Sequence, residues 1–189
     1  EKLNPDGFDI WCRLLREVPG SVLWLAPANR AAMTNLRLEA QRRDVAANRL
    51  LFASRMPTLS EHLGRLTWAD LALDTFPYTS HTTGSDALWA GVPLITLQGQ
   101  TFVSRIASGM LHAVGLPELV THSWEAYFDL ALELARNPDR LSALRQRLWA
   151  NRLTHPLFDT ERFTRDLERL YERMWQDHGL GKRTLIELS

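Results

Sequence analysis

Short runs of consecutive apolar residues alternate with amphipathic helical segments through about the first half of this chain, and this alternation limits its possible folds most strongly. A continuous apolar run is typical of a strand that is buried on both faces of a parallel sheet. Strands are predicted on this basis at residues 22–25, 50–52, 71–74 and 93–97. Helical patterns lie between them, so the sequence predicts an α/β fold with an open sheet. In such sheets ligands bind beyond the carboxyl ends of the strands.

The remainder of the chain, from residue 102 onward, has helical patterns almost throughout. Capping residues predict helix starts at Ser123, Asn137-Pro138 and Asp159-Thr160. The last helix has an apolar stripe that we interpret as a packing surface, formed by Phe163, Leu167, Leu170, Tyr171 and Met174. A chain of 189 residues suffices for one well-formed core. We predict a single lobe over residues 1–189, with an α/β core at about 1–122 and a helical part at about 123–178.

Charge and motif content argue against several classes of function. The 22 basic and 22 acidic residues give zero net charge, so no field of one sign attracts nucleic acid or an anionic membrane. No transmembrane or signal segment is recognisable, and we expect a cytoplasmic protein. The six histidines lack metal-ligand spacing, and neither a G-x-G-x-x-G nor a P-loop motif is present. Cys12, the single cysteine, lies beside Trp11 in a helical pattern and is interpreted as a buried apolar side chain.

The stretch Ser80-His81-Thr82-Thr83-Gly84-Ser85-Asp86 concentrates groups that are suited to binding a ligand. It follows the third predicted strand and leads into a helical pattern. Amides at a helix start have no acceptor within the helix, and the helix dipole adds partial positive charge, so a phosphate is favoured there. Thr82 and Thr83 add hydroxyl donors, Gly84 permits close approach to the backbone, and His81 offers a further donor.

Asp86 has two interpretations from the residues alone. It would repel a phosphate if it pointed at one, so we expect it to accept hydrogen bonds from ribose hydroxyls, and nucleotide sugars combine a pyrophosphate with a ribose. Alternatively, Thr83 and Asp86 have the spacing of a capping box, which commonly does no more than begin a helix. The local pattern leaves both interpretations open.

A wider set of segments supports a resemblance: residues 80–93, Leu73-Asp74-Thr75 and Ser104-Arg105-Ile106-Ala107, with residues 4–5, 19–25, 152–158 and 167–171 in the same order. Together they resemble the carboxy-terminal catalytic lobe of the protein O-GlcNAc transferase family (GT41-type glycosyltransferases), in a bacterial-type homologue. The resemblance implies the Rossmann-like, nucleotide-binding lobe of a GT-B fold, with a helical C-terminal extension. It also implies a larger parent chain with an N-terminal catalytic lobe and tetratricopeptide (TPR) repeats, UDP-N-acetylglucosamine (UDP-GlcNAc) as donor, a protein acceptor and no catalytic metal.

The resemblance also implies roles for individual residues. Lys2 matches the family lysine that contacts the donor diphosphate, and its ammonium would stabilise departing UDP, so it is the predicted catalytic residue. His62 and Arg65 match a histidine near the ribose and an arginine near the uracil. The backbone around Met56 and Pro57 would complete recognition of the base. Without the resemblance, His62 and Arg65 are typical of a solvated helix face.

The predicted phosphate loop comprises His81, Thr82, Thr83 and Gly84, and Asp86 matches the ribose-binding aspartate. One departure lies just before His62: the family often has a lysine there, whereas this chain has Thr58-Leu59-Ser60 in a loop one residue longer. We expect this difference to alter the affinity for UDP or its pose. Asp74, at the exposed sheet edge, is interpreted as a loop organiser and not as a base.

The sequence therefore predicts the UDP-GlcNAc-binding lobe of an inverting glycosyltransferase that transfers N-acetylglucosamine to Ser or Thr hydroxyls of proteins. The lobe alone is expected to be inactive, because the acceptor site and the proton-transfer groups belong largely to the other lobe and the repeats. Three alternatives remain: a GDP-fucose-dependent protein O-fucosyltransferase, a GT-B-like sugar-nucleotide epimerase, and a non-catalytic nucleotide-sensing adaptor. The sequence assigns no acceptor protein, general base or oligomeric state.

Overall fold

The computed structural model describes residues 3–181 and has the predicted α/β order. Two sets of parallel strands form its centre: β1 (Leu23–Leu25) with β2 (Leu50–Phe52), and β3 (Ala72–Leu73) with β4 (Leu94–Leu97) and β5 (Val120–Thr121). The four predicted strands are confirmed, and β5 was not predicted because two residues give no apolar run. The single predicted sheet is divided, since β2 and β3 share no ladder in the described part of the chain.

The helices lie close to their predicted positions. They are α1 (Pro5–Glu17), α2 (Arg30–Gln41), α3 (Leu59–Leu66), α4 (Thr82–Trp89), α5 (Ile106–Ala113), α6 (Trp124–Arg136), α7 (Pro138–Asn151) and α8 (Thr160–Gly179). Four 3-10 turns join them to neighbouring elements: η1 (Ala47–Arg49), η2 (Phe102–Ser104), η3 (Pro117–Leu119) and η4 (Pro156–Phe158). The predicted caps hold, because the side chains of Asn4, Ser123 and Asn137 each accept a hydrogen bond from the amide three residues later.

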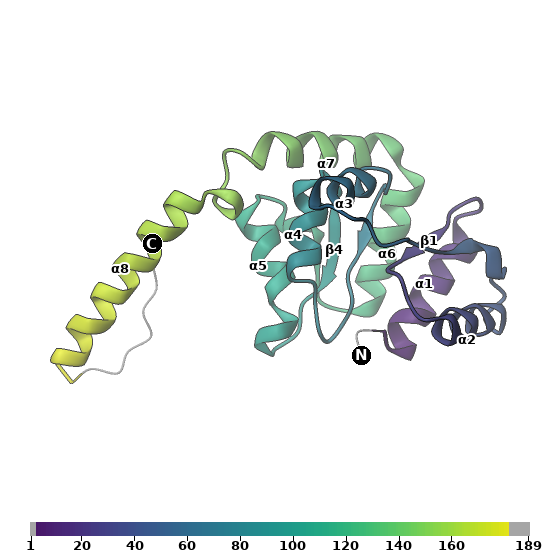
Figure 1. Cartoon of the computed structure of the whole chain (residues 1–189), viewed down its shortest axis with the longest axis horizontal. Coiled ribbons are helices and arrows are strands. Elements are labelled where there is room, and N and C mark those ends of the chain that lie inside the picture. Colours follow the sequence, from purple (N-terminus) through teal and green to yellow (C-terminus); the bar gives the residue numbers. More distant parts are fainter. Residues whose placement is uncertain (1–2, 182–189) are drawn as a thin grey trace.

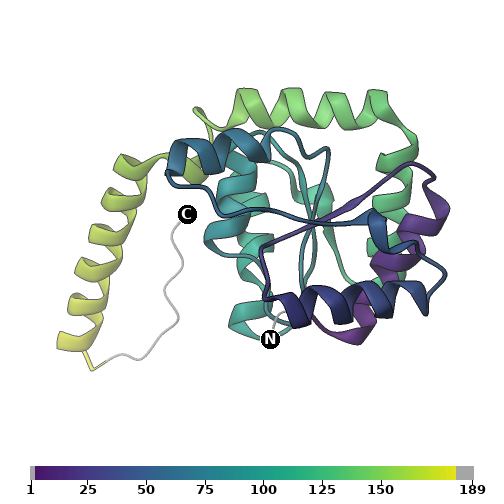
Figure 2. The same cartoon turned by 45° about the vertical axis from the view of Figure 1, so that its right-hand side comes forward.

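Strand β4 lies at the centre of the core, and all four of its residues are buried. Helix α6 packs against β4 and against α1, while α5 contacts β4 as well. Helix α7 then crosses one end of this body, as both views show (Figures 1 and 2). Cys12 is fully buried in the same core, as predicted. The helical part of the chain therefore shares one core with the strands.

Helix α8 departs from the prediction. Its stripe was expected to pack, yet Phe163, Tyr171 and Met174 are all more than half exposed. The reason is its direction: after η4 the helix leaves the body and projects away from it (Figure 1). Within residues 3–181, η4 is the main element that α8 contacts, so much of the stripe remains exposed. None of the helices in this range has both the length and the apolar composition needed to span a bilayer.

Candidate functional site

Helix α4 begins at Thr82, directly after the loop that follows β3, with His81 as its N-cap residue. The His81 carbonyl accepts hydrogen bonds from the amides of Gly84 and Ser85, both at 3.0 Å. Within residues 3–181, the amides of Thr82 and Thr83 have no acceptor, and both residues are exposed. Two N–H groups at the positive end of the helix dipole are thus open to an anion.

The capping-box alternative for Asp86 is wrong. Because the helix begins at Thr82, Thr83 already lies inside its first turn and cannot serve as the N-cap residue. The Asp86 carboxylate instead faces α3, where its Oδ2 lies 3.2 Å from Nε2 of His62. Asp86 therefore joins two helices at the edge of the sheet.

His62 and Arg65 both lie on α3, and a hydrogen bond between their side chains extends the contact with Asp86. A capping box between Thr58 and Glu61 fixes the start of that helix. One guanidinium nitrogen of Arg65 lies 3.0 Å from Nδ1 of His62. A guanidinium can only donate, so Nδ1 accepts and the imidazole proton lies on Nε2, from which it is donated to Asp86. Arg65 also donates to the Ser54 carbonyl, just after β2.

The side chain of His81 has an unusual environment. Its ring stacks on Tyr78, with 4.9 Å between centroids and 18° between planes. Its Nε2 atom is buried, yet it has no hydrogen-bond partner among the described residues. Buried polar atoms are nearly always satisfied, so an unsatisfied one indicates a place for a ligand or an ordered water. His81 is the N-cap residue of α4 and directly precedes Thr82 and Thr83, whose amides are free.

Asp74 is buried, which corrects the prediction of an exposed carboxylate. Its role as a loop organiser is confirmed. One oxygen accepts hydrogen bonds from the Thr75 amide at 2.8 Å, the Ser80 amide at 2.8 Å and the Ser80 hydroxyl at 2.6 Å. The other accepts from the Thr96 hydroxyl at 2.6 Å. The Asp74 carboxylate therefore holds both ends of the loop from Thr75 to Ser80, which directly precedes His81.

Burial also shifts the pKa values of two groups in this network. It raises the pKa of the Asp74 carboxyl, against the hydrogen bonds from Ser80, Thr96 and Thr75 that lower it. The fully buried Tyr127 donates from its hydroxyl to the Asp74 carbonyl at 3.0 Å. Burial raises the pKa of Tyr127 as well, so its phenol remains a donor. Neither Thr96 nor Tyr127 was predicted, because each lies in an ordinary apolar segment without a recognisable motif.

Packing also requires glycine at position 84, and the predicted close approach of a phosphate stays a prediction. The residue is buried, and a Cβ atom there would lie 2.9 Å from both the Ser80 Cβ and the Met110 Cε, closer than carbon atoms pack. Its small size lets α4 approach α5 and the preceding loop. The open amides at this helix start belong to Thr82 and Thr83.

The remaining predicted residues lie around the same edge. Met56 and Pro57 are in the loop between β2 and α3, and within the described range the Met56 amide donates no hydrogen bond. Leu59, at the position of the family departure, is the first residue of α3 and is 68% exposed. Lys2 lies outside the described residues. Asn4 donates from its side chain to the Phe76 carbonyl, so the start of α1 is attached to the loop that Asp74 organises.

Three features lie at the carboxyl edge of the parallel strands: a helix start with open amides, an unsatisfied histidine and a His–Asp pair. Together they define an α/β lobe of the nucleotide-binding type. Residues 1–167 match the family model described as Glycosyl transferase family 41. The chain belongs to this family. Within residues 3–181, no three or more His, Cys, Asp and Glu side chains form a group that could hold a metal ion.

Relatives and a solved structure agree with this membership. A probable UDP-N-acetylglucosamine–peptide N-acetylglucosaminyltransferase of Arabidopsis thaliana, named SEC, is 40% identical over 96% of this chain and 19% of its own length. The UDP-N-acetylglucosamine–peptide N-acetylglucosaminyltransferase of Caenorhabditis elegans is 34% identical over 95% of this chain and 16% of its own length.

A mutant of Thermobaculum terrenum O-GlcNAc transferase has a similar structure, with a TM-score of 0.87 and 36% identity over 93% of this chain and 34% of that chain. The predicted α/β lobe of a GT-B glycosyltransferase is confirmed by this likeness. The chain spans about a fifth of the length of the curated relatives and about a third of the solved one.

Proposed function

We propose that this chain is the donor-binding lobe of an enzyme that transfers N-acetylglucosamine from UDP-GlcNAc to Ser or Thr hydroxyls of proteins. The observation that carries the proposal is the start of α4, where the buried Nε2 of His81 has no partner among the described residues and the amides of Thr82 and Thr83 are open. An oxygen-rich anion would satisfy all three groups. The printed names of the relatives specify this donor and a peptide acceptor.

The donor would lie across the carboxyl edge of the strands. Its diphosphate would occupy the α4 start, its ribose would bind Asp86 beside His62, and its uracil would lie near Arg65 and the loop at Met56 and Pro57. The Asp86 carboxylate has further acceptor capacity beyond the one contact with His62, so two ribose hydroxyls have a place to donate.

Departure of UDP requires that the charge developing on its diphosphate be stabilised. We propose that this is done without a metal, by the Lys2 ammonium together with the open amides of α4. The chain itself holds the leaving group, while the acceptor site and the groups that move the proton from the acceptor hydroxyl belong to the N-terminal lobe and the TPR repeats of the parent protein. We place the enzyme in the cytoplasm.

Calorimetric titration of the full-length protein with UDP and with GDP, in the presence of EDTA, tests the donor assignment. We expect micromolar binding of UDP and much weaker binding of GDP. A preference for GDP would move the donor to GDP-fucose. Binding of neither nucleotide would contradict a transferase and would favour an adaptor.

Replacing Asp86 with alanine should weaken UDP binding by about 5- to 150-fold, corresponding to the loss of a ribose hydrogen bond worth about 1–3 kcal/mol. Titration of the full-length variant measures this change. Asp139, an exposed carboxylate in the first turn of α7, provides a matched control, and Asp139→Ala should bind UDP like the unmodified protein. Equal UDP affinity in both variants would remove Asp86 from the nucleotide site.

A further inference from the structure

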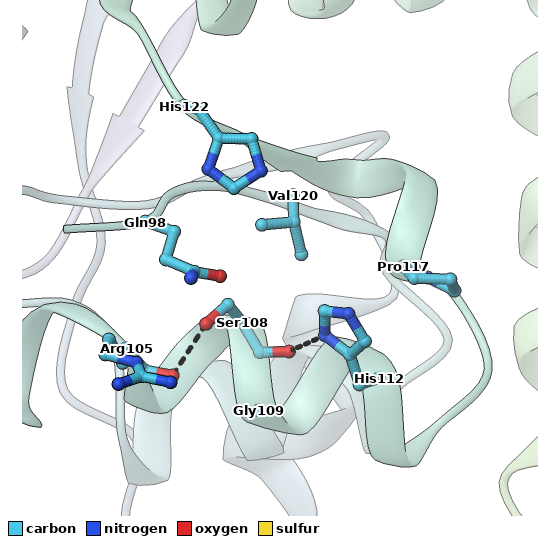
Figure 3. A pocket seen from close by; sticks show the side chains of 8 residues that line it. All are labelled: Gln98, Arg105, Ser108, Gly109, His112, Pro117, Val120 and His122. Carbon is cyan, nitrogen blue, oxygen red and sulfur yellow. Dashed lines mark hydrogen bonds between the residues drawn. The ribbon is translucent and has the colours of Figure 1, made fainter. Parts of the chain in front are cut away.

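A pocket lies at the carboxyl edge of the strands, and none of the predicted donor residues lines it. It has a volume of about 420 Å³ and is bounded by the ends of β4 and β5 and by α5. Gln98 directly follows β4 and His122 directly follows β5. In Figure 3 these two side chains lie opposite α5, which contributes His112, while its N-cap residue Arg105 contributes at the start of the helix.

The polar groups of this pocket are mostly without partners. Within residues 3–181, the side chains of Gln98, Arg105 and His122 make no hydrogen bond or ion pair. His112 uses one nitrogen, because its Nδ1 lies 2.8 Å from the Ser108 carbonyl and donates to it, so Nε2 remains available. Four polar side chains thus surround one space with unused hydrogen-bonding capacity.

The pocket is lined by basic side chains and by no acidic ones. Its lining includes the guanidinium of Arg105 and two imidazoles but no carboxylate. Glu118 follows the lining residue Pro117 and is the nearest acidic residue in sequence, but it is paired with Arg147. An arginine without a counter-ion presents up to five N–H donors in a planar fork that matches the oxygens of carboxylate and phosphate groups.

The pocket is also connected to the loop that precedes α4. The segment after β4 borders the pocket, and its Val103 carbonyl accepts hydrogen bonds from the Thr79 amide at 3.1 Å and the Thr79 hydroxyl at 2.6 Å. The Gln98 amide donates to the Thr121 carbonyl at 2.9 Å, which ties the ends of β4 and β5 together. These hydrogen bonds therefore fix the backbone of the segment after β4 and of the strand ends that border the pocket.

We propose that this pocket is a binding site for an oxyanion, a carboxylate or a phosphate group, held by Arg105 with Gln98, His112 and His122 as further hydrogen-bonding groups. Its volume exceeds that of one such group, so a larger ligand that carries the anion, such as an acidic side chain of a polypeptide, also fits. The lining shares no residue with the predicted donor site, and the proposal does not depend on the identity of the nucleotide.

The test uses the full-length protein at fixed low ionic strength with saturating UDP, so that the α4 start is occupied. Binding of a rhodamine-labelled hexaglutamate peptide is followed by fluorescence anisotropy, with hexaglutamine as the neutral probe. We expect Arg105→Gln to weaken hexaglutamate binding about tenfold, as for loss of a charge-assisted hydrogen-bonded pair. Arg105→Lys should retain part of the affinity, because it keeps the charge but not the fork.

The control is Arg30→Gln, which removes an exposed arginine at the start of α2. Inorganic phosphate as a competitor distinguishes the two sources of the anion: displacement of the peptide indicates a site for free phosphate, and no displacement indicates a site for peptide carboxylates. Equal hexaglutamate affinity in Arg105→Gln and Arg30→Gln, or equal binding of hexaglutamine, would overturn the proposal. UDP affinity, measured separately, tests the donor site and leaves this result independent.

Discussion

Replacing Asp74 with alanine should lower the free energy of unfolding by about 3 kcal/mol, because buried donors would lose their acceptor. Two amides and two hydroxyls converge on this carboxylate, and the Asp74 side chain is buried. Urea unfolding followed by circular dichroism measures the loss. Asp70→Ala is the matched control: the Asp70 side chain is 89% exposed, and its removal should change stability by less than about 0.5 kcal/mol.

The asparagine variant separates hydrogen bonding from charge. In Asp74→Asn the amide oxygen can accept the three bonds from Thr75 and Ser80, and the new NH₂ group can donate to the Thr96 hydroxyl, which rotates to accept. We therefore expect a loss of only about 1 kcal/mol. If asparagine were as damaging as alanine, the charge of Asp74 and not its acceptor geometry would hold the loop.

Replacing Lys2 with alanine in the full-length protein should lower kcat about 100-fold, while UDP affinity changes by less than about threefold. The charge on the diphosphate increases as the glycosidic bond breaks, so an ammonium placed beside it stabilises the transition state more than the bound donor. Initial-rate kinetics with UDP-GlcNAc, together with UDP titration, separate the two effects.

The sequence provides its own control for that experiment, because Lys182 is the only other lysine. Lys182→Ala should leave both kcat and UDP affinity unchanged. A similar loss in the two variants would indicate a general effect of charge. Unchanged turnover in Lys2→Ala would remove Lys2 from the mechanism.

The elements that sequence reasoning predicted best are those with a local cause. Asn137-Pro138 places a capping side chain and a preset backbone angle at one helix start, and the helix begins there. The apolar run at residues 50–52 follows Arg49, and it forms a strand with the same bounds. Such features depend on a few neighbouring residues, so they can be read without knowing the rest of the fold.

The features that were missed depend on residues far apart in the chain. Asp74 was expected at the exposed sheet edge, as the last residue of a predicted strand, yet Thr96 and Tyr127, 22 and 53 residues away, bond to it. Asp86 had the spacing of a cap, and only the position of His62 on α3 shows its actual contact. The pocket at Arg105 combines residues from separate segments, Gln98 after β4 and His122 after β5, and only Arg105 lies in a segment that sequence reasoning singled out. Of the predicted donor residues, the structure brings His62, Arg65 and Asp86 into one hydrogen-bonded chain, and their contact with a nucleotide stays a prediction.

The position of α8 outside the body determines how this helix unfolds locally. Its main contact with the body is η4, so its backbone hydrogen bonds are stabilised almost only by the helix itself. In a chain of these residues alone, fraying of α8 leaves the core around β4 intact. Amide hydrogens along α8 should then exchange with solvent through local opening, whereas those of β4 exchange only when the whole body unfolds. Slower exchange of α8 in the full-length protein would show that another part of the molecule covers its aromatic face.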